Sequence, residues 1–109
     1  MSIELPVLPD LRMTLAAPDV EASFEIANLL ADRVRIGILA VLRTGPVCVC
    51  EMAAALGERQ NNVSNHLARL RAAGLVRPSR HRADSRRVYY ERDETALAAA
   101  FSPLRDIIQ

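Results

Sequence analysis

Cys48 and Cys50 are the side chains of this sequence best suited to binding a soft ion. One residue separates them, and they follow Pro46 at a point where the pattern predicts the start of a helix. Thiols at a first helical turn can converge, and the dipole and unpaired amides there would lower their pKa and favour thiolates. Thiolates bind soft ions such as As(III), Cd(II), Zn(II), Hg(II) and Cu(I). Two ligands are too few for tetrahedral zinc, so a third donor would come from the N-terminal residues, water or another subunit.

Other interpretations of these groups stay open. The cysteines can be two small buried hydrophobic residues, or a dithiol that responds to redox state. His81 lies beside the predicted hairpin tip, and with acidic residues of positions 1–25 it would form an unorthodox site for a harder ion, Ni(II). His66, next to the apolar Leu67, is interpreted as a packing or hydrogen-bonding residue rather than a ligand.

Short polar side chains gather on a predicted helix over residues 60–73. Val63, Leu67 and Leu70 recur at helical spacing and predict its buried face. Amides and one hydroxyl fill most other positions of its first half: Gln60, Asn61, Asn62, Ser64 and Asn65. A merely solvated face more often carries Glu, Lys and Arg, whereas Asn and Gln can bond adenine in the major groove. The pattern predicts a DNA recognition helix; the alternative is a polar solvent face with local capping.

Charge is distributed unevenly along the chain although the net charge is only +1. Residues 1–32 hold one arginine against six acidic residues, whereas residues 59–92 hold nine arginines against two. Such a basic block indicates a surface that binds a polyanion, although a solvated arginine-rich face would have the same composition. The candidate phosphate contacts, on the recognition helix and the hairpin, are Arg69, Arg71, Arg80, Arg82, Arg86 and Arg87.

The length and composition of the chain limit its fold class and the kinds of function it can have. A chain of 109 residues with 50% apolar and 4% aromatic residues predicts one mainly helical domain. No apolar run reaches the roughly 18 residues that a membrane span needs, and the N-terminus lacks the basic region of a secretion signal. The two cysteines are too close in sequence for a disulfide that would stabilise the fold. We therefore expect a cytoplasmic protein without a membrane segment. The sequence has no lysine, and its residues do not form a catalytic set of nucleophile, base and orienting group. We therefore do not expect an enzyme.

The order of the predicted elements is that of a winged helix-turn-helix, mainly α with a β-hairpin wing. Residues 1–17 are expected to form an extended arm, and residues 18–109 a DNA-binding and dimerisation domain. Helices are predicted over 18–30, 33–43, 49–56 and 60–73, strands over 75–76 and 86–91, and a last helix from 94 that Pro103 interrupts.

Apolar stripes on the first and last helices exceed what one small core needs. The first helix carries Val20, Phe24, Ala27 and Ala31, and the last carries Leu97, Phe101, Leu104 and Ile108. Pairing these helices across a two-fold axis predicts a homodimer whose recognition helices lie about one DNA turn (~34 Å) apart.

Several runs closely resemble the ArsR/SmtB family of metal-sensing repressors over about residues 20–108. They are residues 48–53, 56–57, 63–67, 70–71, 74–76 and 86–90. The resemblance implies a homodimer that occupies an inverted-repeat operator, blocks transcription and dissociates when an inducer binds, with Cys48 and Cys50 matching the thiolate site. The sequence departs from the family pattern at Ala53, where a third cysteine is common, and residues 94–109 contain no histidine.

We therefore predict a metal- or metalloid-responsive DNA-binding repressor. The first alternative is a winged-helix regulator without its own metal site, controlled by a regulatory protein partner or by the redox state of Cys48 and Cys50. A module that binds another protein instead of DNA is a second alternative, and a flat salt dependence without operator preference would favour it.

Overall fold

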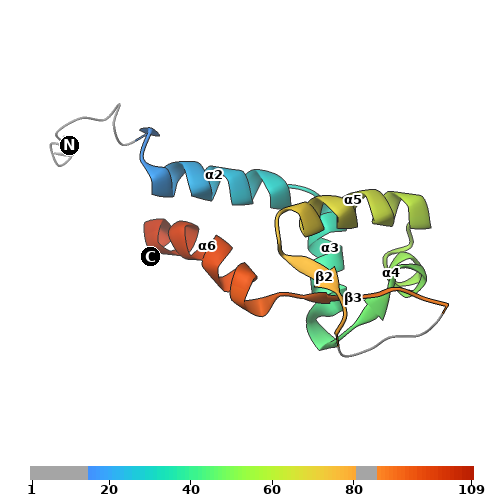
Figure 1. Cartoon of the computed structure of the whole chain (residues 1–109). Helices are drawn as coiled ribbons and strands as arrows, with labels where there is room; N and C mark the ends of the chain where they lie inside the picture. The colour runs from blue at the N-terminus through green and yellow to red at the C-terminus, as the bar shows by residue number, and fades with distance from the viewer. Residues whose placement is uncertain (1–14, 81–85) are drawn as a thin grey trace, which may run out of the picture.

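The computed structural model of the chain describes residues 15–80 and 86–109 (Figure 1). Its elements follow in this order: α2 (Pro18–Leu30), α3 (Arg33–Val41), a short 3-10 turn (Leu42–Thr44), β1 (Val47–Cys48), α4 (Val49–Leu56), α5 (Gln60–Ala72), β2 (Val76–Pro78), β3 (Tyr89–Arg92) and α6 (Glu94–Ile108). Most of the predicted N-terminal arm, and the hairpin tip with His81, Arg82 and Ser85, lie outside the described residues.

The core joins α3, α4 and α5 to the sheet. Ile38, Met52, Val63, Leu70 and Leu75 are almost completely buried, and they belong to one apolar cluster. The predicted buried face of α5 is thus confirmed, because burying apolar side chains at this spacing on one helix face removes them together from water. α4 ends at Gly57, whose φ of 66° is a left-handed value that favours glycine.

Asp32 starts α3. Its carboxylate accepts hydrogen bonds from the amides of Val34 and Arg35, at 2.9 and 3.1 Å. Those amides would otherwise lack partners at the helix start, so Asp32 caps α3. The amide of Arg35, followed by other contacts that include His66, holds the pKa of Asp32 below its usual value.

A three-stranded antiparallel sheet in the order β1-β3-β2 replaces the expected two-stranded hairpin. In β1, Val47 pairs with Tyr90 and Cys48 with Tyr89. The prediction missed this strand because two residues between Pro46 and a helix are too few to show an alternating pattern. The wing strands are also shifted: β2 extends to Pro78, and β3 starts at Tyr89 rather than at position 86.

The prediction that Pro103 interrupts the last helix was wrong. α6 continues through Pro103 to Ile108. A proline inside a helix removes one backbone hydrogen bond, and the fifteen-residue helix tolerates this loss near its C-terminal end.

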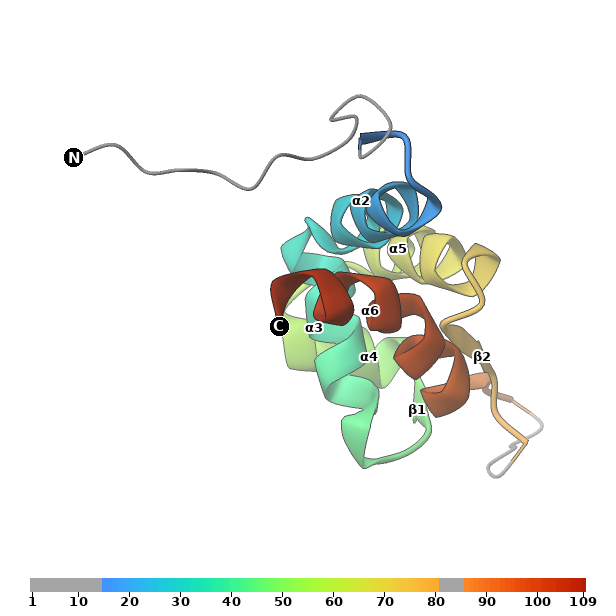
Figure 2. The ribbon, with the colours of Figure 1, turned by 90° about the vertical axis from the view of Figure 1, so that its left-hand side faces the viewer.

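The buried face of α2 is not the predicted stripe. Ser23 and Ile26 are buried, whereas Phe24 is 62% exposed and Ala27 is also exposed. Figures 1 and 2 show α2 running beside α6 at one end of the molecule, and these two helices contact each other extensively. α2 therefore packs on α6 with one face and leaves its other apolar face uncovered.

The other helices keep their predicted positions. α2 and α4 have the expected bounds, α5 ends one residue early, and the second predicted helix ends at Val41 before continuing as the 3-10 turn. None of the helices in the described ranges 15–80 and 86–109 combines the length and hydropathy needed to cross a bilayer.

Candidate nucleic-acid interface and thiol site

The two cysteine side chains converge where β1 meets α4. Cys48 ends the strand with extended backbone angles (φ −85°, ψ 162°), and Cys50 lies in the first turn of the helix. This change of backbone direction brings the two Sγ atoms to 2.7 Å. This short separation confirms the predicted convergence of the two side chains at the helix start. Both cysteines are free thiols.

The environment of Cys48 favours the neutral thiol. Its side chain is buried, and its Sγ donates a hydrogen bond to Oε1 of Glu51 at 3.1 Å. Burial above all, then the hydrogen bonds with Cys50 and Glu51, raise the pKa of Cys48. The expectation that the helix start would lower this pKa was wrong, because desolvation and a neighbouring carboxylate outweigh the helix dipole.

A hollow of about 310 Å³ adjoins the thiols. Its walls come from the β1–α4 junction, the start of α5 and the residues that precede β3: Cys48, Val49, Cys50, Gln60, Arg86, Arg87 and Val88. Attraction by Cys50, together with a hydrogen bond to Tyr89, raises the pKa of the Arg87 guanidinium. Arg87 therefore contributes a cationic side chain to the same hollow that the thiols line.

As metal ligands, the two thiols supply only part of a coordination shell. No group of three His, Cys, Asp or Glu side chains in the part of the chain that the structure describes is arranged to hold a metal ion. The buried Ala53 occupies the position where the resemblance places a third cysteine. Two converging sulfur atoms fit a soft ion as two of its ligands, and the remaining ligands must come from elsewhere.

His66 is placed for a structural role, as interpreted from the sequence. It is half-buried, and its Nδ1 lies 3.8 Å from Oδ1 of Asp32, the capping residue of α3. This contact joins α5 to the start of α3.

The outer face of α5 presents the polar side chains that the sequence singled out. Six of the seven are exposed: Gln60, Asn61, Ser64, Asn65, Arg69 and Arg71. The exception is Asn62, which is half-buried and donates from Nδ2 to Oε2 of Glu58 at 2.9 Å. That bond holds the Asn62 amide against the turn before α5, where it stabilises the turn.

The arginines of the basic block divide into two groups. Arg77 pairs with Asp93 at 2.7 Å, and Arg92 pairs with Glu94 at 2.9 Å while donating to the Leu39 carbonyl oxygen at 3.1 Å. Arg77 and Arg92 therefore hold the sheet against the start of α6 and against α3. Arg80, Arg86 and Arg87 are exposed on the wing, and Arg82 lies outside the described residues.

The contact of Gln60 and Arg87 with the thiol hollow could not be foreseen from spacing. Gln60 is ten residues from Cys50 along the chain, and Arg87 is brought there by the pairing of β3 with β1. Tyr89 is buried and Tyr90 is half-buried against the core, so this pairing also anchors the wing in the core.

Several known proteins are similar to this chain in sequence and in fold. The pattern described as "Bacterial regulatory protein, arsR family" matches residues 32–77. The HTH-type transcriptional regulator CmtR of Mycobacterium tuberculosis is 36% identical over 83 residues, which cover 76% of this chain and 68% of that protein. The chain belongs to the ArsR family. This ArsR-family chain is a DNA-binding transcriptional regulator with a winged helix-turn-helix, from a family of regulators rather than enzymes.

Two further similarities bear on this ArsR-family chain. The Arsenical resistance operon repressor of Escherichia coli is 42% identical over 53 residues, and the match spans 48% of this chain and 45% of that repressor. A homodimeric winged helix-turn-helix DNA-binding domain from Mycobacterium bovis, a possible ArsR-family regulator, matches with a TM-score of 0.60 and 25% identity, covering 95% of this chain and 90% of that one.

The two thiols should differ in reactivity. A Cys50→Ser variant keeps only the buried Cys48, and a Cys48→Ser variant keeps only the half-buried Cys50. We expect iodoacetamide to modify the Cys50-only protein at least about tenfold faster at pH 7.5, because burial hinders the reaction and favours the neutral thiol at Cys48. Mass spectrometry over time measures both rates, and equal rates would contradict the geometry described.

Proposed function

We propose that this chain is a dimeric repressor that binds an inverted-repeat operator and is released by a soft metal or metalloid ion at Cys48 and Cys50. The observation that carries the proposal is the hollow beside the thiols, because Gln60 and Arg87, two candidate DNA contacts, form its walls. An ion that completes its coordination there must share space with side chains that would otherwise contact DNA.

In this proposal α5 enters the major groove with its first half. Gln60, Asn61, Ser64 and Asn65 are exposed and carry groups that can bond base edges. Arg69 and Arg71, further along the helix, are suited to phosphates, as are the arginines of the wing: Arg80, Arg82, Arg86 and Arg87. Asn62 is the weakest of the predicted base contacts, because its amide is bonded to Glu58.

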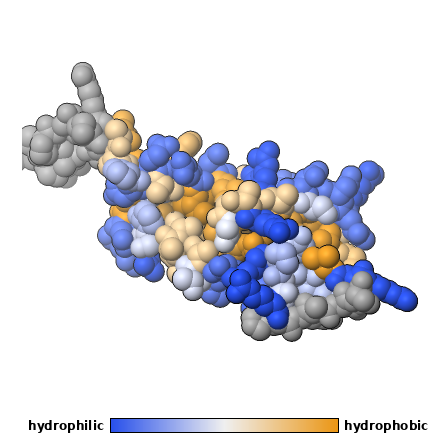
Figure 3. Space-filling view, in the orientation of Figure 1, coloured by the Kyte–Doolittle hydropathy of each residue, from blue (hydrophilic) through white to orange (hydrophobic). Residues whose placement is uncertain are grey.

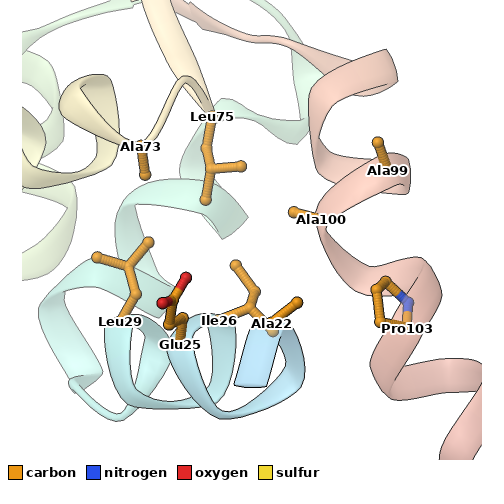
Figure 4. A pocket seen from close by; sticks show the side chains of 9 residues that line it. All are labelled: Ala22, Glu25, Ile26, Leu29, Ala73, Leu75, Ala99, Ala100 and Pro103. Carbon is orange, nitrogen blue, oxygen red and sulfur yellow. The ribbon is translucent and has the colours of Figure 1, made fainter. Parts of the chain in front are cut away.

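The uncovered apolar surface on α2 and α6 supports a homodimer. Phe24 and Ile108 are 62% and 73% exposed, and apolar side chains are visible along both helices in Figure 3. Between the helices lies a hollow of about 470 Å³ whose walls include four alanines, with Glu25 as the one charged residue among those lining it (Figure 4). A second copy would cover these surfaces, and the homodimeric M. bovis domain is consistent with such an assembly.

Operator release follows from a difference in affinity between two states of the dimer. An ion bound at the thiols lowers operator affinity only as far as it favours positions of α5 and the wing that fit DNA less well. Because a bacterial regulator meets its DNA in the cytoplasm, we propose that this chain acts there. As(III), Cd(II), Zn(II) and Cu(I) are the candidate ions, and a Ni(II) site with His81 would involve residues outside the described ranges.

A redox-controlled regulator is the second candidate. The 2.7 Å separation of the sulfur atoms favours it, because two thiols this close can form a disulfide with a small movement. Control by a regulatory protein partner would instead leave DNA binding insensitive to both ions and oxidants.

DNA binding should depend on the exposed residues of α5. We expect Arg69→Ala to make the salt dependence of binding shallower by about 0.9 for each phosphate that is no longer neutralised, hence about 1.8 for a dimer. Asn65→Ala should lower the preference for the operator over random DNA by about 1–3 kcal/mol if it removes a bidentate hydrogen bond to a base. Fluorescence anisotropy at several salt concentrations, with DNA from upstream of the protein's own gene, measures both effects.

Arg105→Ala serves as the control for charge. Arg105 lies near the end of α6, far from α5 and the wing (Figure 1). This variant should bind like the unmodified protein; an equal loss of affinity in all three variants would argue against α5 as the recognition helix.

The oligomeric state tests the apolar surface of α2. We expect Phe24→Asp to shift the protein toward monomers in sedimentation velocity experiments, because a charge in an apolar interface must be desolvated without a partner. Val88→Asp places the same charge on another exposed apolar residue, on the wing, and should leave the dimer intact. A dimer unaffected by Phe24→Asp would place the interface elsewhere.

The inducer is identified by titrating the protein–operator complex with each ion. A thiophilic ion should release the unmodified protein, and the doubly substituted Cys48→Ser/Cys50→Ser variant should stay bound. Release by hydrogen peroxide without any ion, reversed by dithiothreitol, would instead establish the redox candidate. If neither ions nor oxidant release the protein, the cysteine pair is not its sensor.

A further inference from the structure

A small hollow lies between α5 and the central strand of the sheet. Its volume is about 110 Å³, and its walls are formed by Val49, Ser64, Leu67, Ala68, Arg71 and Tyr90. This volume is well below the roughly 300–1,000 Å³ of pockets that enclose small organic ligands, so the hollow has room for a single compact group. None of these six residues is acidic, and Arg71 brings a positive charge.

The polar groups of this hollow come from two elements that are far apart in the sequence. On α5, Ser64, Ala68 and Arg71 follow one another at intervals of four and three residues, which places them on one face of the helix. Ala68, between the other two, has a small side chain that leaves the hollow open. From β3, Tyr90 lines the same hollow, and its position is fixed because it pairs with both neighbouring strands.

The three polar side chains of the hollow are available to a ligand. Within the described residues, the side chains of Ser64, Arg71 and Tyr90 have no hydrogen-bond or ion-pair partner. Arg71 differs in this respect from Arg77 and Arg92, which have carboxylate partners. A hydroxyl, a guanidinium and a phenol can all donate hydrogen bonds, and a cation among these donors favours an anion with several oxygen atoms.

The place of the hollow in the fold points to the source of this anion. When α5 lies in the major groove and the wing reaches the neighbouring minor groove, the sugar–phosphate backbone that separates the two grooves must pass between them. The hollow lies between α5 and β3, the strand that returns from the wing. A phosphate of that backbone is therefore the oxygen-rich anion that would meet the three donors.

We infer that this hollow binds one phosphate group of the DNA backbone in each half-site, with Ser64, Arg71 and Tyr90 as its hydrogen-bond donors. This inference rests on the proposed function, in which α5 enters the major groove. It adds Tyr90 to the DNA contacts, and it gives Ser64 a phosphate rather than a base edge as its partner. One phosphate would thus join α5 and the sheet of the wing to the same DNA strand.

The first test removes the two hydroxyl donors singly and measures binding to operator and to random DNA by fluorescence anisotropy. Tyr90→Phe deletes one hydroxyl and keeps the ring, and Ser64→Ala changes an exposed residue of α5, so neither should disturb the fold. Each should weaken binding to both DNAs by about tenfold, because a hydrogen bond to a charged phosphate is lost while the base contacts remain. The salt dependence should stay unchanged, since no charge is removed.

Two further variants separate charge from the loss of a hydroxyl. Arg71→Ala should make the salt dependence shallower by about 0.9 for each phosphate that is no longer neutralised. Ser102→Ala removes a hydroxyl from α6, outside the hollow, and should bind both DNAs like the unmodified protein.

Neutral phosphates in the operator locate the contact. Single methylphosphonate groups, which lack the charge and one oxygen atom of a phosphate, are placed in turn along the backbone of a half-site. At one position the substitution should weaken binding of the unmodified protein by about tenfold or more. The triple variant Ser64→Ala/Arg71→Ala/Tyr90→Phe, measured at low salt, should lose less than about twofold there, because it has already lost that contact. A structural role of Tyr90 alone would not produce this coupling at a single phosphate.

The outcomes separate this inference from the proposed function. A loss on the operator alone would make Ser64 or Tyr90 a base contact and overturn the inference, as would equal effects of methylphosphonate on the unmodified protein and the triple variant. If ions release the operator as proposed while Tyr90→Phe and Ser64→Ala bind DNA like the unmodified protein, the proposed function stands and the inference is wrong. If the phosphate contact is found but neither ions nor oxidant release the operator, the inference stands and the proposed control by the thiols is wrong.

Discussion

The pairing of Val47 and Cys48 with Tyr90 and Tyr89 is the interaction on which the functional geometry depends. This two-residue strand places the thiols at the start of α4 and holds the strand that returns from the wing against them. Since α4 and α5 are consecutive helices joined by a short turn, the same pairing also sets the wing's position relative to the recognition helix. Without it, the thiols and the wing residues Arg86 and Arg87 would not line the same hollow.

Electrostatics in this protein serves two separate purposes. Arg77 and Arg92 have carboxylate partners and hold the sheet to the helices around it. The exposed arginines of α5 and the wing are accessible to solvent, and a cation that is to meet a phosphate gains from being accessible. A count of arginines in sequence therefore overstates the DNA-binding charge.

Much of the fold could be predicted because residues at the helix ends, and the apolar spacing within the helices, mark the helices in the sequence. Asp32, Gly57 and the apolar positions 63, 67 and 70 each act locally, so pattern and structure agree. Features that depend on tertiary contacts could not be predicted: the β1 strand, the buried face of α2 and the continuation of α6 through Pro103. At the site, residue types were predicted, but the raised pKa of Cys48 and the bond from Asn62 to Glu58 depend on burial and neighbours.

The uncovered face of α2 also has a consequence for how a dimeric regulator would respond to its own abundance. Where most chains are monomers, mass action makes the dimer concentration vary with the square of the chain concentration, so halving the protein lowers the dimer about fourfold. Growth and dilution of the cell would then act on operator occupancy more steeply than on the protein level itself. Phe24 and its neighbours on this face would thus influence how sharply the regulated genes switch, far from either the thiols or DNA.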